Sequence, residues 1–338
     1  MITPDAPPAP LGERLAAQLL SGPPAEGTSD VAGHLLAIQA QDPRGARLAV
    51  RARSRTRSAA DVDAALTRDR SVVVTWLNRG TLHLVRTEDY WWLHPLTTPP
   101  LRRGNARRLA QEGVPSADAD RGVAVIERSL AAEGPLTRAQ LRDRIAAAGV
   151  RTEGQAIVHV LMLASLRGLI VRGPMAGREH AYALARDWLG APPAEHALFD
   201  RDRALAELAA RYLAGHGPAT DRDLAKWAGL PLRDAQRGLA ALAGRHSDCP
   251  LPPPRLLGAF DPLLLGWASR EPIVGPHGRL VAINGLFRPF ALVHGRAVGT
   301  WSLPGGQVAL APFAPLSGAD AAALAADAAD VERFLRVS

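Results

Sequence analysis

Two glutamines two positions apart, Gln39 and Gln41, end an apolar run just before Pro43. A primary amide is too weakly basic to take a proton from water near neutral pH. It can accept a hydrogen bond from a water molecule and hold that water in line for attack. It can also turn its carbonyl dipole toward a developing positive charge. The alternative is structural, with Gln39 capping backbone groups and Gln41 solvated.

The local elements decide whether the two amides can act together. Apolar spacing predicts a helix over 29–39, with Gln39 one turn beyond Leu35 and next to the apolar face. Pro43 disfavours helical geometry at Asp42, so we expect an extended exit from this helix. Residues two apart in an extended chain project to the same side. The pair could then converge on one small volume.

A second group of candidates lies in the segment TWLNRGTLHLV at 75–85. Two β-type runs flank a turn at 78–80, which predicts a hairpin over 71–85. Alternation places Thr81 and His83 on one face of the returning strand. His83 could equally be hydrogen-bonded packing, and Trp76 fits a core position better than a stacking one. The residues that could line the site are Asp42, Trp76, Arg79, Thr81 and His83.

The positive charge of the chain is carried almost entirely by arginine. The formal net charge is +7, and of 40 Lys and Arg residues only Lys226 is a lysine. Such a balance suggests a polyanionic partner, nucleic acid first and a membrane surface second, although a GC-rich genome also explains the arginine bias. One candidate patch for phosphates contains Arg51, Arg53, Arg55 and Arg57, which would form a ridge in a strand or a solvated patch in a loop. A second patch of the same ambiguity, at 101–109, contains Arg102 and Arg103.

Several classes of protein are excluded by what the sequence lacks. The single cysteine, Cys249, excludes an internal disulfide and a Cys-rich metal site. No HExxH, P-loop, GxSxG or strand-linked GxGxxG occurs, which argues against metal, nucleotide and serine-nucleophile enzymes. The start lacks the order of a signal peptide, and no apolar stretch approaches about 18 residues. We therefore expect a cytoplasmic protein without metal, cofactor or membrane partner.

An internal repeat indicates how these candidates are organised. The pattern G-P-x-T-x-x-x-L occurs at 134–141 and at 217–224, each time after an amphipathic helix. Thr137 and Thr220 stand at N-cap positions, with Gln140 and Asp223 three residues later. A third helix follows each copy, from 154 and from 232, and two β-type runs follow the first, at 169–173 and 180–184. Three helices with a two-stranded wing are typical of the winged-helix variant of helix-turn-helix.

The remaining segments complete the predicted fold. The N-terminal region fits the same plan less cleanly, with helices over 11–20, 29–39 and 59–67 before the hairpin. Strand-like segments at 256–267, 286–301 and 306–313 precede a final helix over 318–335. We expect a mainly α fold with β wings (α+β). Its predicted parts are winged-helix domains at 1–115, which carries the two glutamines, 116–195 and 196–256, and a β-rich C-terminal segment with the final helix at 257–338.

Four segments together resemble a known family. LLAIQAQDP, TWLNRGTLHLV, LLGAFDPLLLGW and HGRAVGTW are similar, in that order, to segments of the AlkZ-like DNA glycosylases. The family's catalytic motif, Gln-Φ-Gln or Gln-Φ-Asp, falls on Gln39-Ala40-Gln41, where Ala40 is smaller than the usual aliphatic residue. The resemblance covers about residues 11–335. It implies three tandem winged-helix domains around a DNA cleft.

The resemblance also implies an activity. Members of the family excise bulky alkylated purines, and some unhook interstrand crosslinks made by DNA-alkylating natural products, a form of self-resistance. We therefore expect a monofunctional, monomeric, cofactor-free DNA glycosylase that acts on double-stranded DNA with alkylated or crosslinked purines, in the cytoplasm with the nucleoid. The alternatives are a winged-helix transcriptional regulator and a catalytically inactive damage binder. A regulator usually dimerises on paired half-sites, whereas three unlike copies in one chain suit a clamp around a lesion.

Overall fold

The computed structural model describes residues 9–177, 179–196, 198–240, 250–277, 280 and 286–336. Cys249 lies outside the described residues. The described chain combines many helices with antiparallel sheets, which confirms the predicted α+β class. Two compact units are present. Unit 1 combines residues 1–62 with 205–338, and unit 2 is the continuous stretch 63–204.

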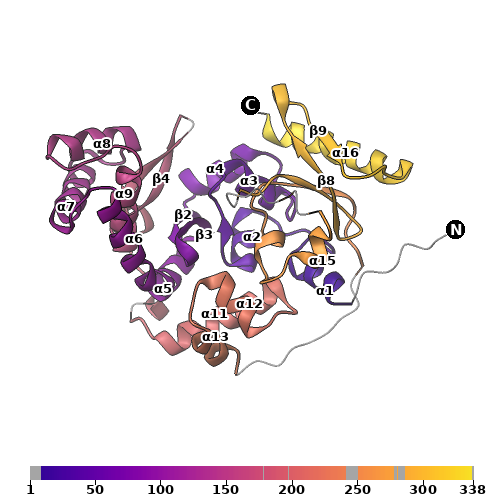
Figure 1. The fold of residues 1–338 in the computed structure, drawn as a ribbon, viewed down its shortest axis with the longest axis horizontal. Helices are drawn as coiled ribbons and strands as arrows, with labels where there is room; N and C mark the ends of the chain where they lie inside the picture. Colours follow the sequence, from indigo (N-terminus) through magenta and orange to yellow (C-terminus); the bar gives the residue numbers. More distant parts are fainter. Residues whose placement is uncertain are drawn as a thin grey trace. The chain divides into compact units, whose positions relative to one another are not determined.

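Unit 1 brings the two ends of the sequence together. Its first part contains α1 (Ala9–Ala17), α2 (Thr28–Leu35), β1 (Ile38–Gln39) and α3 (Pro43–Arg51), and α4 (Ala59–Thr67) leads into unit 2. Its second part contains α11 (Arg201–His216), α12 (Asp221–Ala228), α13 (Leu232–Leu239), β6 (Arg255–Leu257), α14 (Pro262–Leu265), α15 (Glu271–Val274), β7 (Phe290–Val293), β8 (Arg296–Ser302), η4 (Pro304–Gly306), β9 (Ala309–Pro312) and α16 (Gly318–Leu335). Strands β6-β7-β8-β9 form an antiparallel sheet in that order, and α16 runs alongside it (Figure 1).

The core of unit 1 explains why its two parts fold together. Leu11 and Leu15 of α1 belong to one apolar cluster with Leu257, Phe290 and Leu292 of the sheet. All five side chains are almost fully buried. Since neither part could bury these surfaces alone, the N-terminal helix and the C-terminal sheet depend on each other.

Unit 2 contains the predicted hairpin and the first repeat copy. Its elements are β2 (Val72–Leu77), η1 (Asn78–Gly80), β3 (Thr81–Arg86), α5 (Thr87–Thr97), α6 (Pro99–Gln111), α7 (Ser116–Glu133), α8 (Arg138–Ala147), α9 (Ala156–Leu166), β4 (Ile170–Ala176), β5 (Glu179–Leu184), α10 (Ala185–Leu189) and η2 (Ala194–His196). Within this unit the strands lie in the antiparallel order β3-β2-β4-β5. The hairpin turns at the predicted residues, and Asn78 takes a positive φ of 28° there.

Both predicted N-caps are present. The Thr137 Oγ1 accepts a hydrogen bond from the Gln140 backbone N–H at 3.3 Å, and the Gln140 side chain accepts one from the Thr137 N–H at 2.8 Å. Thr220 and Asp223 make the same reciprocal pair at 3.2 and 2.9 Å. The shared sequence pattern therefore starts the same kind of capped helix, α8 in one copy and α12 in the other.

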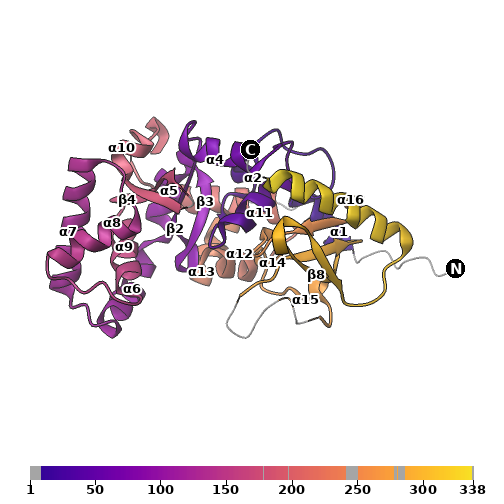
Figure 2. The same ribbon diagram turned by 90° about the horizontal axis from the view of Figure 1, so that it is seen from above.

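Helix α9 of unit 2 is covered on the side where α6 lies (Figure 2). The Asn105 side chain of α6 donates to the His159 carbonyl at 3.1 Å, and Arg102 donates to the Leu166 carbonyl at 3.0 Å. Most residues of α9 are buried in the core of the unit. Few of its side chains are therefore exposed to a ligand in solution.

Several sequence predictions are wrong in their bounds. Helix α2 ends at Leu35, because Leu36 takes a φ of 66° that a right-handed helix cannot continue. Of the predicted strand at 256–267, only 256–257 belong to a strand, β6. The Asp261 carboxylate caps α14 by accepting from the Leu263 N–H at 2.9 Å, so the chain is helical soon afterwards. Strand β4 continues through 174–176, beyond the predicted end of this run at 173, with a register shift after Arg172. The other predicted strand-like segments contain strands, although a turn at 294–295 divides 286–301 into β7 and β8, and α1 ends at Ala17, before the predicted end at residue 20. The final helix is confirmed, and 241–244 of the predicted helix from 232 lie outside the described residues.

Candidate active site

The two glutamines sit in an extended segment between α2 and α3. Gln39 belongs to β1 and is 8% exposed, whereas Gln41 is exposed. The chain enters α3 immediately afterwards, because the Asp42 carboxylate accepts a hydrogen bond from the Arg44 N–H at 3.1 Å and Pro43 begins the helix. The extended exit predicted from Pro43 is present. Gln41 therefore lies at the point where the strand-like segment becomes a capped helix.

The start of α3 packs directly on the segment 258–260. A Cβ added at Gly45 would lie 2.2 Å from the Ala259 carbonyl oxygen, and one added at Gly258 would lie 2.9 Å from the Gly45 Cα. Neither contact could be relieved by rotating a flexible side chain. Glycine at both positions thus allows the backbone after the Gln-x-Gln motif to contact a segment more than 200 residues later in the sequence.

A cavity of about 560 Å³ opens between these two segments. Gln41, Asp42 and Pro43 line one part of it, and Ala259 and Phe260 line another. The remaining lining residues are Leu286, Phe287, Arg288 and Pro289. The volume lies within the range of about 300–1,000 Å³ found for small-molecule sites. All of these residues belong to unit 1.

Two phenylalanines and two arginines distinguish this cavity chemically. The rings of Phe260 and Phe287 have centroids 5.3 Å apart with their planes tilted by 51°. The Arg270 guanidinium lies 4.9 Å from the Phe287 centroid, and burial lowers the pKa of Arg270. Arg288 is exposed at the rim. The lining thus combines flat apolar surface, an amide, a carboxylate and a cation.

No sequence pattern singled out Phe260, Phe287 or Arg288 as site residues. Phe260 lies in a segment predicted as strand. A signal was present, since the dipeptide Asp261-Pro262 before an apolar run is typical of a helix start and hence of a preceding loop. For Phe287 and Arg288, proximity to Gln41 arises only from the tertiary fold.

The predicted arginine ridge is wrong for Arg51 and Arg53. Helix α3 continues through Arg51, so alternate residues do not share a face. Arg51 donates to Asp327 at 2.8 Å and to Asp330 at 2.7 Å of α16, and its side chain is 2% exposed. Arg53 is fully buried against Asp261. Both arginines therefore form buried ion pairs that stabilise unit 1.

The other two arginines of that stretch are exposed. Arg55 lies 3.3 Å from Glu26, with both side chains more than half exposed. The Arg57 backbone N–H donates to the Asp61 carboxylate at 3.2 Å, and the Arg57 carbonyl accepts from the Arg333 guanidinium at 2.8 Å. Arg55 and Arg57 stay predicted DNA contacts.

The hairpin candidates belong to unit 2 and are described within it. Trp76 is 6% exposed and stacks on Tyr182 with centroids 6.5 Å apart, so its side chain is part of the core. Arg79 is exposed at the tip of the hairpin, and Thr81 is partly buried. His83 is 2% exposed, and its Nδ1 lies 3.0 Å from the Thr81 carbonyl oxygen.

The electrostatics of His83 bear on its chemistry. Burial, assisted by the positive charge of Arg79, lowers the pKa of His83 to about 3. The imidazole is therefore neutral at pH 7, with Nδ1 donating to the Thr81 carbonyl. A neutral imidazole of this kind is a poor proton donor to a leaving base.

The second predicted basic patch lies on α6. Arg102 is exposed but donates two hydrogen bonds to the Leu166 carbonyl, at 3.2 and 3.0 Å. Arg103 is also exposed, as is Arg107 one turn later on the same face. Arg108 is held by Glu112 at 3.1 Å. The outer face of α6 thus presents Arg103 and Arg107 to solvent.

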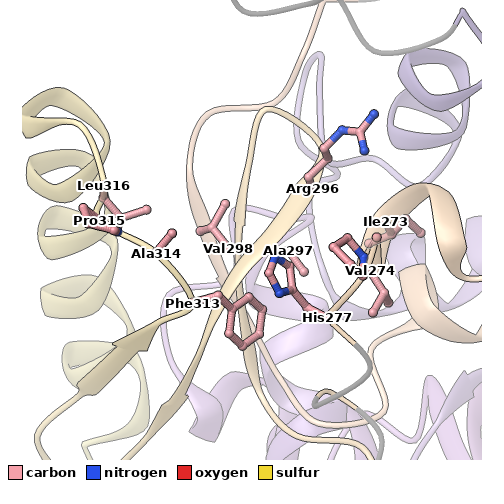
Figure 3. Close-up of a pocket in the computed structure, with 12 residues that line it drawn as sticks. Ile273, Val274, His277, Arg296, Ala297, Val298, Phe313, Ala314, Pro315 and Leu316 are labelled. Atoms are coloured by element: carbon pink, nitrogen blue, oxygen red, sulfur yellow. The ribbon is translucent and has the colours of Figure 1, made fainter.

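A smaller cavity of about 250 Å³ lies elsewhere in unit 1, between α15, β8 and residues 313–316 (Figure 3). The rings of His277 and Phe313 stack there with centroids 4.4 Å apart. Its other walls are mainly aliphatic, and none of the predicted site residues lines it.

Metal sites and membrane spans have no candidate in the part of the chain that the structure describes. Among these residues no group of three or more His, Cys, Asp or Glu side chains is placed to hold a metal ion. Within the same part of the chain, no helix has the length and apolar character needed to span a bilayer.

Comparison with known proteins shows to which family of proteins the chain belongs. The family model for AlkZ-like DNA glycosylases matches residues 32–334, and the chain belongs to this family. That membership places it with DNA glycosylases and not with winged-helix regulators.

Individual relatives agree with this assignment. An interstrand DNA cross-link repair glycosylase from Streptomyces sahachiroi is 28% identical, with 96% of this chain and 95% of the relative covered. The solved structure of the S. sahachiroi DNA glycosylase AlkZ has the same fold, with a TM-score of 0.74, 24% identity, and coverage of 96% of this chain and 95% of that one.

Proposed function

We propose that this protein hydrolyses the N-glycosidic bond of N7-alkylated purines in double-stranded DNA, with Gln39 and Gln41 as its catalytic residues. The observation that carries the proposal is the position of Gln41 and Asp42 in the wall of a cavity large enough for a modified base. Gln41, the second glutamine of the family's Gln-Φ-Gln motif, lines this cavity, whereas the buried Gln39 is not among its lining residues.

The chemistry suits an amide pair because the leaving group is already activated. Alkylation at N7 makes the purine cationic, so the C1′–N9 bond can break with its electron pair passing to the base, which leaves neutral. The amide oxygens orient a water molecule toward C1′ and stabilise the oxocarbenium-like centre. The water oxygen bonds to C1′ and its proton passes to solvent, leaving an abasic site. Asp42 adds negative charge beside the developing cation.

We propose that bulky N7 adducts and interstrand crosslinks are included among the substrates. The cavity of about 560 Å³ has room beyond a methylated base. The S. sahachiroi relative is named for repair of interstrand crosslinks. Self-resistance to a DNA-alkylating natural product would be the corresponding biological role, served by a monomer in the cytoplasm, close to the nucleoid and without a cofactor.

We also propose that residues 116–195 form a winged helix used as a scaffold. The order α7, α8, α9, β4, β5 is that of a winged helix, and Leu136 between α7 and α8 exchanges backbone hydrogen bonds of 3.0 and 2.7 Å with Tyr182 of β5. In a regulator the third helix reads the major groove. Here α9 is covered by α6, which argues against that use. We propose the same winged-helix fold for residues 1–115 and 196–256.

The first test is single-turnover release of 7-methylguanine from alkylated duplex DNA. Gln41→Ala and Gln39→Ala should each lower the rate by about 10²-fold or more, the size of effect typical for a lost transition-state dipole. Affinity for the duplex should change little. Gln307→Ala is the matched control, because Gln307 is exposed in unit 1 and does not line the cavity. Thermal unfolding of each variant separates loss of chemistry from loss of fold, and wild-type rates in both variants would refute the assignment.

A further inference from the structure

Phe260 and Phe287 occupy the cavity beside Gln41 and Asp42 without a role in the hydrolysis described above. Both side chains are only partly buried, although phenylalanine is among the residues most often fully buried. Their rings contact each other with centroids 5.3 Å apart and line the same open volume. Apolar rings in such a position imply a ligand surface.

Phe260 is held in place against a local conformational preference. Its φ of 57° is left-handed, a conformation that is unfavourable for a residue other than glycine. The next residue, Asp261, is fixed by the fully buried Arg53 at 2.7 Å, and Gly258 is wedged against Gly45. The surrounding contacts therefore impose the backbone conformation that places the Phe260 ring in the cavity wall.

Phe287 is fixed by a different contact. The Arg270 guanidinium lies 4.9 Å from the ring centroid, and the Arg270 Nε donates to the Leu264 carbonyl at 2.8 Å. Because the guanidinium is anchored at the end of α14, it holds one side of the ring through a cation–π contact. The two rings thus form a preorganised surface.

The charges around the rings match an adducted nucleotide. Asp42 offers a carboxylate toward a cationic base, and the exposed Arg288 offers a guanidinium toward a phosphate. A purely aliphatic ligand would use neither charge. A planar aromatic group on a cationic purine could contact both rings and the Asp42 carboxylate, and the phosphodiester that carries it could contact Arg288.

We propose that Phe260 and Phe287 form a specificity subsite that stacks on the planar aromatic part of an N7 adduct. The proposal rests on the glycosylase function above and extends it from alkylated purines in general to adducts that carry an aromatic substituent. The rings bind the substituent, while Gln39 and Gln41 act at C1′.

The experiment compares three duplexes that contain N7-methylguanine, N7-benzylguanine or N7-(cyclohexylmethyl)guanine. The leaving base is a cationic guanine in each, so the substituent alone differs. In the wild type, N7-benzylguanine should be excised with the highest kcat/KM of the three lesions. Phe287→Leu should lower that value by about tenfold or more, as expected for one lost stacking interaction, and should lower the ratio of the benzyl to the N7-methylguanine value by a similar factor. Phe287→Tyr should restore the benzyl rate.

Phe313→Leu is the matched control, because Phe313 is also partly buried but lines the smaller cavity of about 250 Å³. Phe260→Leu should act like Phe287→Leu if circular dichroism shows that it folds. Equal losses on all three lesions, equal losses on the benzyl and cyclohexylmethyl lesions, no loss, or the same loss in Phe313→Leu would each overturn the proposal.

Binding separates this proposal from the proposed function. If the wild type released none of the three bases, the glycosylase assignment would fail, and affinity measured by fluorescence anisotropy would still test the subsite. A tighter complex with the benzyl duplex that weakens in Phe287→Leu would support the stacking subsite. Equal wild-type affinity for all three duplexes would refute it.

Discussion

Arg53 and Asp261 form a bidentate ion pair, and both side chains are fully buried. The Arg53 Nη2 donates to one Asp261 oxygen at 2.7 Å and Nη1 donates to the other at 3.0 Å. The same carboxylate caps α14, and the same guanidinium also binds the Gln18 and Ala49 carbonyl oxygens. The pair therefore ties the end of α3 to the segment that carries Phe260.

Removing either member of this pair should destabilise unit 1 strongly. Asp261→Asn or Arg53→Met would leave a buried charge without its partner, and each should lower the free energy of unfolding by about 3–5 kcal/mol. Arg55→Met is the matched control, because Arg55 pairs with Glu26 in solvent and should cost at most about 1 kcal/mol. Urea denaturation provides the measurement. A loss for Asp261→Asn no larger than that control would contradict the structural role.

Stability should fall as the solution is made mildly acidic. Burial lowers the pKa of His83 and His216 to about 3 and that of His94 to about 4. In the unfolded chain these groups titrate near about 6.5. The unfolded state thus binds more protons between about pH 6.5 and 4, so the stabilisation is complete above that range and is lost as pH falls through it.

Each of the three histidines can contribute a slope of up to about 1.4 kcal/mol per pH unit. Urea denaturation at pH 7.5, 6.0 and 5.0 would measure the combined slope. His83→Asn, with a side chain that does not titrate, should reduce it. A free energy of unfolding that stays constant from pH 7.5 to 5.0 would show that these imidazoles protonate without cost in the folded state.

Excision should not depend on a histidine acid. Because His83 is neutral across the working range, release of 7-methylguanine should show no ionisation near pH 6.5. Uracil and 8-oxoguanine, which must be protonated as they leave, should be excised at least about 10²-fold more slowly. A duplex panel with one defined lesion each, assayed from pH 6 to 8, tests both points. Efficient uracil excision would mean that a general acid operates in the site.

DNA affinity should be electrostatic and largely independent of sequence. The log of the binding constant should fall with log salt at about −0.9 per neutralised phosphate. Arg103 and Arg107 lie one turn apart on the exposed face of α6, so the double variant to alanine should reduce the magnitude of the slope by about 1–2. Arg108→Ala should change it less, because Glu112 and Gln111 already hold that guanidinium. An unchanged slope in the double variant would place the phosphate contacts elsewhere.

The product should be an abasic site with an intact strand. A glycosylase with lyase activity forms a Schiff base through an amine, and Lys226 is the single lysine of the chain. Its Nζ donates to the Ala268 carbonyl at 2.9 Å, at the end of α12. Borohydride should therefore trap no covalent adduct with damaged DNA. Trapping that disappears in Lys226→Ala would reverse this conclusion.

Local signals in the sequence were sufficient for the elements that depend on neighbouring residues. Thr137 and Thr220 start helices because an N-cap needs only the following turn. The hairpin around Asn78 follows from two β-type runs and a turn between them. Likewise, Pro43 was enough to predict extended geometry at Asp42, although the end of the preceding helix at Leu35, before Gln39, was not predicted.

Local signals could not predict which of these arginines are buried and which are exposed. Arg51, Arg53, Arg55 and Arg57 have the same residue type and spacing. The first two are buried and the last two are exposed. Their partners, Asp327 and Asp261, are more than 200 residues away in the sequence. Burial of a charge depends on whether a carboxylate arrives from elsewhere in the fold, and no local pattern contains that information.

The family motif, the two capped helices, the hairpin and the basic balance of the chain could all be predicted from the amino-acid sequence, because each depends on residue type and short-range spacing. The tertiary structure decided that Gln41 and Asp42 share a cavity with Phe260 and Phe287. It did so through close packing of Gly45 on Gly258 and through the buried Arg53–Asp261 pair. Such contacts form only when the two ends of the chain fold together around one core, because only then are the apolar surfaces and the charges of both parts removed from water.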